Sequence, residues 1–216
     1  EDINKTKVLG VYTLNDQPLD KRQERNFNVE LSKQIKKHDL VIVSDYGHGL
    51  ISDSSAKSII KKSKFTAVNT QVNASNLGFH VISKYTGANL ITINETELRH
   101  ELRNKTDDRK SLIKKLSKKL KSVYTNVTCG VEGSFIYSKL SKKIINCPAF
   151  ANKVTDKVGT GDTMLSMLAI SIYKKYNVQF SMLLSALAAA YNIQYMANKI
   201  PLGKTYIIRS LQSYLK

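Results

Sequence analysis

The segment that decides the fold of this chain is Asp156-Lys157-Val158-Gly159-Thr160-Gly161-Asp162-Thr163. Two glycines flank one residue directly before a predicted helix over residues 162–176. Glycine lets a phosphate approach the backbone closely, and the N–H groups at a helix N-terminus form an anion hole. Asp162, a carboxylate beside that hole, would be placed to take a proton from an attacking hydroxyl group. Taken alone, the segment is equally typical of a glycine loop in which Asp162 caps the helix.

Around this segment, apolar runs and amphipathic stretches alternate along the chain. Alternating strands and helices indicate an α/β fold with a largely parallel sheet and helices on both faces. Ligands of such sheets bind beyond the carboxyl ends of the strands, where the glycine-rich and polar clusters fall. The pattern predicts strands over residues 8–12, 40–44, 65–69, 88–93, 123–128, 134–137 and 143–147, and helices over residues 22–37, 53–62 (capped by Ser52 or Asp53), 95–102, a stretch to 120 capped by Asp107 or Asp108, 162–176, 180–196 and 205–215.

Composition narrows the class of protein. A chain of 216 residues suits one domain, and its net charge is +17. Because 28 basic residues are Lys and only 6 are Arg, specific nucleic-acid binding is not expected, whereas anionic small molecules would be attracted. The chain has no run of about 18 apolar residues and no signal peptide at its start, so no membrane association is expected. Two cysteines, Cys129 and Cys147, favour a reducing cytoplasm.

Three further polar clusters follow predicted strands. Thr128-Cys129-Gly130-Val131-Glu132-Gly133 would let a backbone pass close to a nucleotide, or would form a hairpin turn. Asn94 and Glu97 could meet on one side of a first helical turn and suit water-mediated Mg²⁺ binding, or they could cap that helix. Asp45 ends a buried strand and is either a site residue or a turn aspartate.

The order of these motifs resembles the PfkB/ribokinase family of carbohydrate kinases. The family hallmark D-x-x-G-A-G-D-[TA] matches residues 156–163, with Thr160 in place of Ala. The N-x-x-E motif matches Asn94 and Glu97, and T-x-G-x-x-G matches residues 128–133. The S-D-Y-G-x-G segment at residues 44–49 is similar to heptose-7-phosphate kinases, with His48 where Lys is common. The resemblance is closest to such kinase domains fused to a nucleotidyltransferase.

The resemblance implies a ribokinase-like three-layer sandwich that phosphorylates a sugar or sugar phosphate from ATP with Mg²⁺. A monovalent cation is left open as a further cofactor, and a fused nucleotidyltransferase domain is an implied partner. By resemblance, Asp162 is the catalytic base and Asn94 and Glu97 organise the Mg²⁺. The remaining roles fall to Gly159, Thr160 and Gly161 as the anion hole, to Thr128, Gly130, Gly133 and Asn192 at ATP, and to Asp45, Asn69 and Gln71 at the acceptor.

One departure from the family concerns the start of the domain. Family members carry an early Gly-Gly segment that binds the sugar, and this sequence contains no Gly-Gly pair. We therefore expect residues 1–20 to be a remnant of the lid strand and its connection, residues 21–216 to be the kinase core, and the N-terminal part of the domain to be missing. An exposed sheet edge left in this way would favour a homodimer. The alternative function is an inactive nucleotide-binding fragment that serves as a scaffold or partner for another domain.

Overall fold

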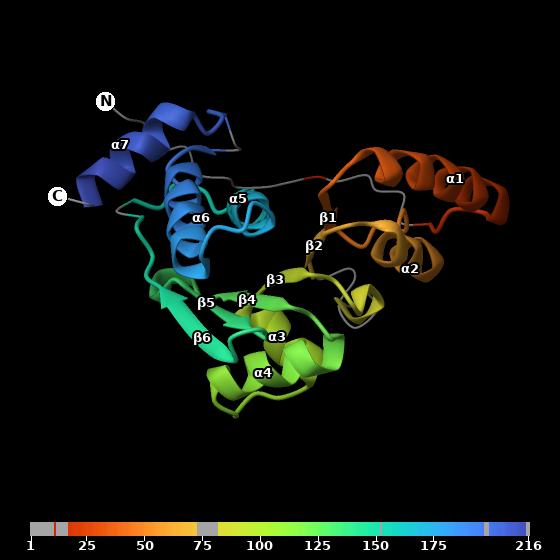
Figure 1. The fold of residues 1–216 in the computed structure, drawn as a ribbon, viewed down its shortest axis with the longest axis horizontal. Helices are drawn as coiled ribbons and strands as arrows, with labels where there is room; N and C mark the ends of the chain where they lie inside the picture. The colour runs from red at the N-terminus through yellow and green to blue at the C-terminus, as the bar shows by residue number, and fades with distance from the viewer. Residues whose placement is uncertain (1–10, 12–16, 73–81, 152, 197–198, 215–216) are drawn as a thin grey trace.

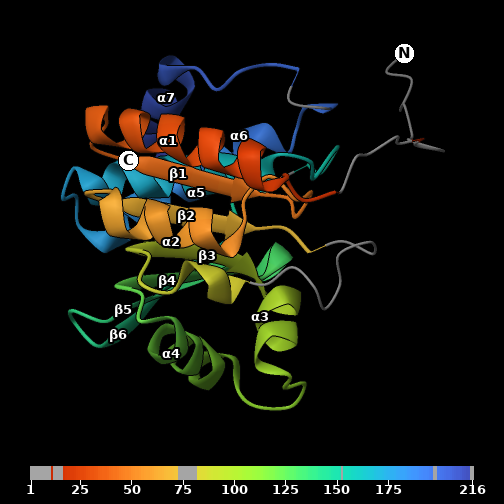
Figure 2. The same ribbon diagram turned by 90° about the vertical axis from the view of Figure 1, so that its right-hand side faces the viewer.

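The computed structural model describes residues 11, 17–72, 82–151, 153–196 and 199–214. Within these residues, six strands form one sheet in the order β1-β2-β3-β4-β5-β6, and Figure 2 shows them stacked in that order. The strand expected over residues 8–12 lies, apart from Val11, outside the described residues. The strands are β1 (Val41–Asp45), β2 (Thr66–Thr70), β3 (Leu90–Asn94), β4 (Tyr124–Thr128), β5 (Ser134–Ser138) and β6 (Lys143–Cys147).

Strands β1 to β4 are parallel and neighbour one another in chain order. Because crossovers between adjacent parallel strands are right-handed, the segments that connect these strands must lie on one face of the sheet. The core of that face is aliphatic: Ile59, Leu98 and Leu116 are buried together with Val68 and Ile91 of the strands. The face carries α1 (Lys21–Lys37), α2 (Asp53–Lys62), the short 3-10 helix η1 (Ile82–Tyr85), α3 (Glu95–Leu102) and α4 (Arg109–Leu120).

The opposite face is covered by helices that follow β6. Strands β4, β5 and β6 pair antiparallel, so the chain reaches the far edge of the sheet without another crossover. It then forms α5 (Thr160–Tyr173) and α6 (Val178–Asn192), and α7 (Lys204–Tyr214) packs on α6 (Figure 1). In α5, Leu165 and Leu168 pack with Ala67 and Leu90 of the sheet. The three-layer α/β sandwich expected from the sequence is confirmed.

Side-chain caps determine where several helices begin. As expected, Ser52 caps α2 and Asp108 caps α4, each by accepting a backbone N–H of the first turn. Asn177 does the same for α6, which therefore begins at Val178 and not at residue 180. Among the described residues, no helix combines the length and the apolar character that crossing a bilayer requires.

Candidate active site

The N-terminus of α5 provides a local anion-binding arrangement. Gly159 is its N-cap with a φ of 75°, in the left-handed region that glycine adopts without strain, so α5 begins at Thr160 and not at residue 162. Among the described residues, no side chain caps this helix end. The first N–H groups of an α-helix have no acceptor inside the helix. The Thr160 N–H donates to the Lys157 carbonyl at 3.3 Å, so the donor that this segment offers in the first turn is the Gly161 N–H, reinforced by the helix dipole.

Asp162 lies in this first turn and faces the end of β1. Its carboxylate accepts a hydrogen bond from Ser44 Oγ at 2.5 Å and a second from the Tyr46 hydroxyl at 2.7 Å. The hydrogen bond to Asp162 is the main cause that raises the pKa of Tyr46. The sequence alone did not single out Ser44 or Tyr46 for this role. The signal that could have identified them is their position on either side of Asp45: alternate residues of a strand point to opposite faces, so both face away from the side chain of Asp45.

Asp45 points to the other face of the sheet, away from Asp162. Its carboxylate is 6% exposed, accepts a hydrogen bond from the Tyr85 hydroxyl at 2.6 Å, and pairs with Lys84 Nζ at 2.6 Å. Burial raises the pKa of Asp45, but hydrogen bonds from Lys84, Tyr85 and Gly47 outweigh it, so the net shift of the pKa is downward. Lys84 also donates to the Ile51 carbonyl at 2.9 Å. Asp45 thus anchors the turn that carries Tyr46, and the structure does not bring it to Asp162.

The other two predicted acceptor residues lie at the end of β2. Asn69 is the register partner of Ser44 and shares its face, and Asn69 Nδ2 donates to the Thr92 carbonyl at 2.8 Å. Gln71 follows the strand, is exposed, and donates its backbone N–H to the Asp45 carbonyl at 2.9 Å. Asn69 is therefore on the α5 side of the sheet, the side on which Ser44 reaches Asp162.

Asn94 and Glu97 meet at the start of α3, as the sequence predicts. They form a capping box: Asn94 Oδ1 accepts the Glu97 N–H at 2.8 Å, and Glu97 Oε2 accepts the Asn94 N–H at 2.8 Å. Glu97 is 8% exposed, and its burial raises the pKa of its carboxyl group. Among the described residues, no cluster of three or more His, Cys, Asp or Glu side chains could enclose a metal ion. Both carboxylate oxygens of Glu97 and the Oδ1 of Asn94 already accept backbone N–H groups, so the structure shows the capping alternative, and Mg²⁺ binding by this pair stays a prediction.

The turn between β4 and β5 lies beside this corner. Thr128 is the register partner of Asn94, so the two predicted motifs end on neighbouring strands. The turn includes the 3-10 helix η2 (Gly130–Glu132), and its flanking glycines, Gly130 and Gly133, both have positive φ. A Cβ atom on Gly133 would lie 2.0 Å from the Cys147 carbonyl oxygen. The hairpin turn, one of the two alternatives that the sequence offers, is present, and the close approach at Gly133 is to the backbone that follows β6. Proximity of this turn to a nucleotide stays a prediction.

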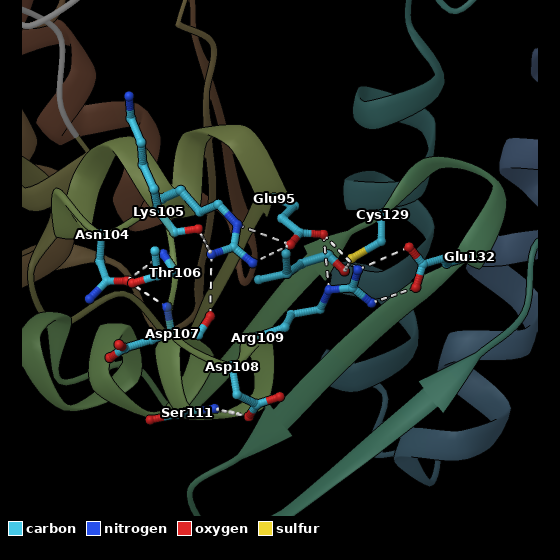
Figure 3. Close-up of polar contacts among 12 residues, drawn as sticks. Glu95, Asn104, Lys105, Thr106, Asp107, Asp108, Arg109, Ser111, Cys129 and Glu132 are labelled. Atoms are coloured by element: carbon cyan, nitrogen blue, oxygen red, sulfur yellow. Dashed lines mark hydrogen bonds and ion pairs between the residues drawn. The ribbon is translucent and has the colours of Figure 1, made fainter.

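An ion-pair network joins these two segments (Figure 3). The Arg109 guanidinium donates from Nε to Glu95 at 2.9 Å, and from Nη1 and Nη2 to both carboxylate oxygens of Glu132 at 2.8 and 3.0 Å. Arg99 holds the other oxygen of Glu95 at 2.8 Å. Burial raises the pKa of the neighbouring Cys129 thiol to about 11, so this thiol is protonated and poorly nucleophilic at neutral pH. No motif in the sequence points to Arg109.

Asn192, at the end of α6, reaches the anion-binding turn. Its Oδ1 accepts a hydrogen bond from Thr160 Oγ1 at 3.2 Å. One residue later, the Ile193 carbonyl accepts the N–H groups of Thr155 at 2.9 Å and Asp156 at 3.2 Å. The end of α6 therefore holds the loop that leads into α5, and it brings Asn192 to the glycine segment.

Comparisons with known proteins agree with this arrangement. The profile described as "pfkB family carbohydrate kinase" matches residues 14–203. The bifunctional protein HldE of Campylobacter fetus is 33% identical over 156 residues, which are 71% of this chain and 33% of that protein. HldE of Helicobacter pylori strain G27 is 29% identical over 175 residues, 75% of this chain and 35% of its own length. The chain thus spans about a third of the length of these curated relatives.

Solved structures show the same fold. Phosphofructokinase-2 from Escherichia coli superposes with a TM-score of 0.75 at 12% identity, covering 92% of this chain and 63% of that chain. A ribokinase from Arabidopsis thaliana, solved with ribose and ATP, gives a TM-score of 0.68 at 20% identity, covering 85% of this chain and 59% of that one. At such identities the likeness is evidence of fold alone. With the family profile, it leads to one conclusion: this chain belongs to the pfkB family of carbohydrate kinases and has a ribokinase-like α/β fold.

Proposed function

We propose that the chain transfers the γ-phosphoryl group of ATP to a hydroxyl group of a sugar or sugar phosphate, with Asp162 as the general base. The observation that carries this proposal is the environment of the Asp162 carboxylate. It stands in the first turn of α5, beside the N–H groups of Gly159, Thr160 and Gly161, and two hydroxyl groups already donate to it. A carboxylate that accepts from hydroxyl groups at an anion-binding turn suits a site where an alcohol attacks a phosphate.

In this mechanism Asp162 takes the proton of the acceptor hydroxyl as its oxygen forms a bond to the γ-phosphorus. The bond between that phosphorus and the bridging oxygen of ADP breaks, and ADP leaves with the electron pair. Charge on the transferred group would be stabilised by the N–H groups of the turn at residues 159–161, once the Thr160 N–H is released from the Lys157 carbonyl. The hydrogen bond from Thr160 to Asn192 would keep that turn in place.

The nucleotide would lie over the carboxyl ends of β3 and β4. Thr128, Gly130 and Gly133 would line it, because this turn follows β4 directly and the position of a Cβ atom on Gly130 is open space. Asn94 and Glu97 would hold Mg²⁺ through its waters, and the ion would neutralise phosphate charge when bound. A monovalent cation is a further proposed cofactor, which replacement of K⁺ by tetramethylammonium in the assay buffer would test.

Support for the acceptor class comes from the relatives. The relatives are named bifunctional protein HldE, and residues 44–49 of this chain resemble heptose-7-phosphate kinases, so a heptose phosphate is the proposed acceptor. Asn69 and Gln71 would face it, with Asp45 acting through the turn that it anchors. We also propose that a nucleotidyltransferase domain is fused to this kinase domain. The boundary between the lid-strand remnant and the kinase core is placed between residues 20 and 21. A homodimer would form through β1, the edge strand of the sheet.

The test compares Asp162→Asn with Asp108→Asn, which replaces another aspartate at a helix N-terminus. Transfer of labelled phosphate from ATP to heptose 7-phosphate should fall by about 10²–10⁴-fold in Asp162→Asn, while its affinity for Mg-ATP is kept. Asp108→Asn should retain both, since asparagine also caps helices. Equal transfer in Asp162→Asn would refute the base. ATP binding without transfer by the unaltered chain would favour the alternative, a nucleotide-binding scaffold.

A further inference from the structure

Arg109 stands where a helix is least suited to a cation. It is the first residue of α4, and positive charge in a first turn opposes the helix dipole. Its side chain is nevertheless only 19% exposed, and its guanidinium carbon lies 4.9 Å from the centre of the Phe135 ring. Burial of an unfavourably placed cation needs compensation by specific partners. Those partners are carboxylates from two other segments of the chain.

The two carboxylates belong to the segments proposed to bind ATP and Mg²⁺. Glu95 follows Asn94 directly and belongs to the same first turn as Glu97. Glu132 lies in the η2 turn, between Gly130 and Gly133. Arg109 contacts both at once, and its pairing with Glu132 is bidentate, which fixes orientation as well as distance. Figure 3 shows the guanidinium between the two carboxylates.

The position of the η2 turn is expected to depend on the contact between Arg109 and Glu132. Both of its glycines have positive φ, and glycine places the least restriction on the backbone. The side chain of Val131 at the tip is 92% exposed, so it contributes little packing. Glu132 links the turn to the β3–α3 corner through Arg109, and the Cys129 thiol at the start of the turn also contacts Glu95.

We propose that Arg109 is a positioning residue for nucleotide binding: it holds the η2 turn at a set distance and angle from the Asn94–Glu97 corner, so that the ATP phosphates and the Mg²⁺ ligands meet. This inference rests on the proposed function, because it assumes that these segments bind Mg-ATP. Lysine could not replace Arg109, since one ammonium group cannot span two carboxylates with the fork of a guanidinium.

The test measures the Kd of Mg-ATP by calorimetry, and the Tm without ligand, for Arg109→Met, Glu132→Ala and the double variant. Loss of a supporting partner of a metal or ligand site commonly costs about tenfold in affinity, so each single variant should raise the Kd by about tenfold. The double variant should be no weaker than Arg109→Met, because removal of Arg109 already breaks its contact with Glu132. Glu132 has a side chain 60% exposed, so Glu132→Ala keeps the test valid if Arg109→Met fails to fold.

The control is Lys119→Met. Lys119 of α4 pairs with Glu101 of α3 at 2.6 Å, so it also joins these two helices, but far from the η2 turn. It should lower the Tm and leave the Kd unchanged. A Kd unchanged in Glu132→Ala or Arg109→Met, with a normal wild-type Kd, would overturn the positioning role alone. A wild-type chain that does not bind Mg-ATP would overturn the proposed function and this inference with it.

Discussion

At the scale of single residues, neighbouring side chains at the end of β1 have different roles because they point to opposite faces of the sheet. Ser44 and Tyr46 donate to Asp162 on the α5 side, whereas Asp45 turns to the opposite side and binds Lys84 and Tyr85. The sequence identified this polar turn and favoured its only carboxylate. Strand alternation predicts that Ser44 and Asp45 point to opposite faces. It does not predict that Asp162 lies on the face of Ser44, because this depends on the packing of α5, and Asp162 is 118 residues after Ser44.

The buried pair of Asp45 and Lys84 predicts a specific dependence of stability on pH. The folded state lowers the pKa of Asp45 below its ordinary value of 3.8, so the pair stabilises the fold above that pH and this stabilisation is lost as the pH falls through the folded-state pKa. Asp45→Asn should lower the free energy of unfolding by about 3 kcal/mol at neutral pH. The deficit should shrink in acid, as measured by urea unfolding across the pH range.

A matched control is Asp39→Asn. Asp39 also pairs with a lysine, Lys64, but both side chains are more than half exposed, so little change in stability is expected at any pH. A deficit of Asp45→Asn that stayed constant from neutral to acid pH would contradict the charged pair as its cause.

At the scale of elements, the turn between β4 and β5 is shaped by two glycines in different surroundings. Gly130 has a φ of 58° with open space where a Cβ atom would lie, whereas Gly133 has a φ of 85° and lies against the backbone at the end of β6. Gly130→Ala should cost about 1–2 kcal/mol, the strain of a left-handed backbone alone. Gly133→Ala adds a collision with the Cys147 carbonyl and should cost more than about 3 kcal/mol, with loss of Mg-ATP binding.

Urea unfolding and ATP titration of the two variants would check this difference. Equal losses of stability would show that the backbone shifts easily to avoid the collision between a Cβ atom at residue 133 and the Cys147 carbonyl. The turn would then not require glycine at this position.

Helices with side-chain caps were the elements most accurately predicted from sequence. Asp108 is followed by an apolar stripe that ends at Leu120, and α4 has those limits. The starts of α5 and α6 were placed too late. At α5 the cap is a glycine backbone with positive φ, which leaves no side-chain signal. At α6 the cap is Asn177, a residue that is as common in loops as at helix starts.

At the scale of the whole molecule, strand order brings the motifs together. Parallel strands in chain order send their carboxyl ends to one edge, so the polar clusters after β1, β2, β3 and β4 share it. The alternation of elements predicted this much. The alternation of elements did not predict the role of Arg109. Glu95 and Glu132 contact Arg109 only after α3, α4 and the β4–β5 hairpin have packed together.

The net charge of +17 adds a second effect at this scale. A strongly basic surface attracts any polyanion, so binding of ATP means little without a comparison to other anions. A site with defined contacts for a nucleotide should distinguish ATP from a phosphate chain of similar charge.

The most direct measurement is therefore a thermal-shift titration of this chain with Mg-ATP, beside Mg-GTP, inorganic tripolyphosphate and no ligand. A ligand at about 100 times its Kd should stabilise the fold by about 2.7 kcal/mol. We predict a clear rise in Tm with Mg-ATP, a smaller rise with Mg-GTP, and little with tripolyphosphate. No rise with Mg-ATP, or an equal rise with tripolyphosphate, would contradict a nucleotide site at the carboxyl edge of the sheet.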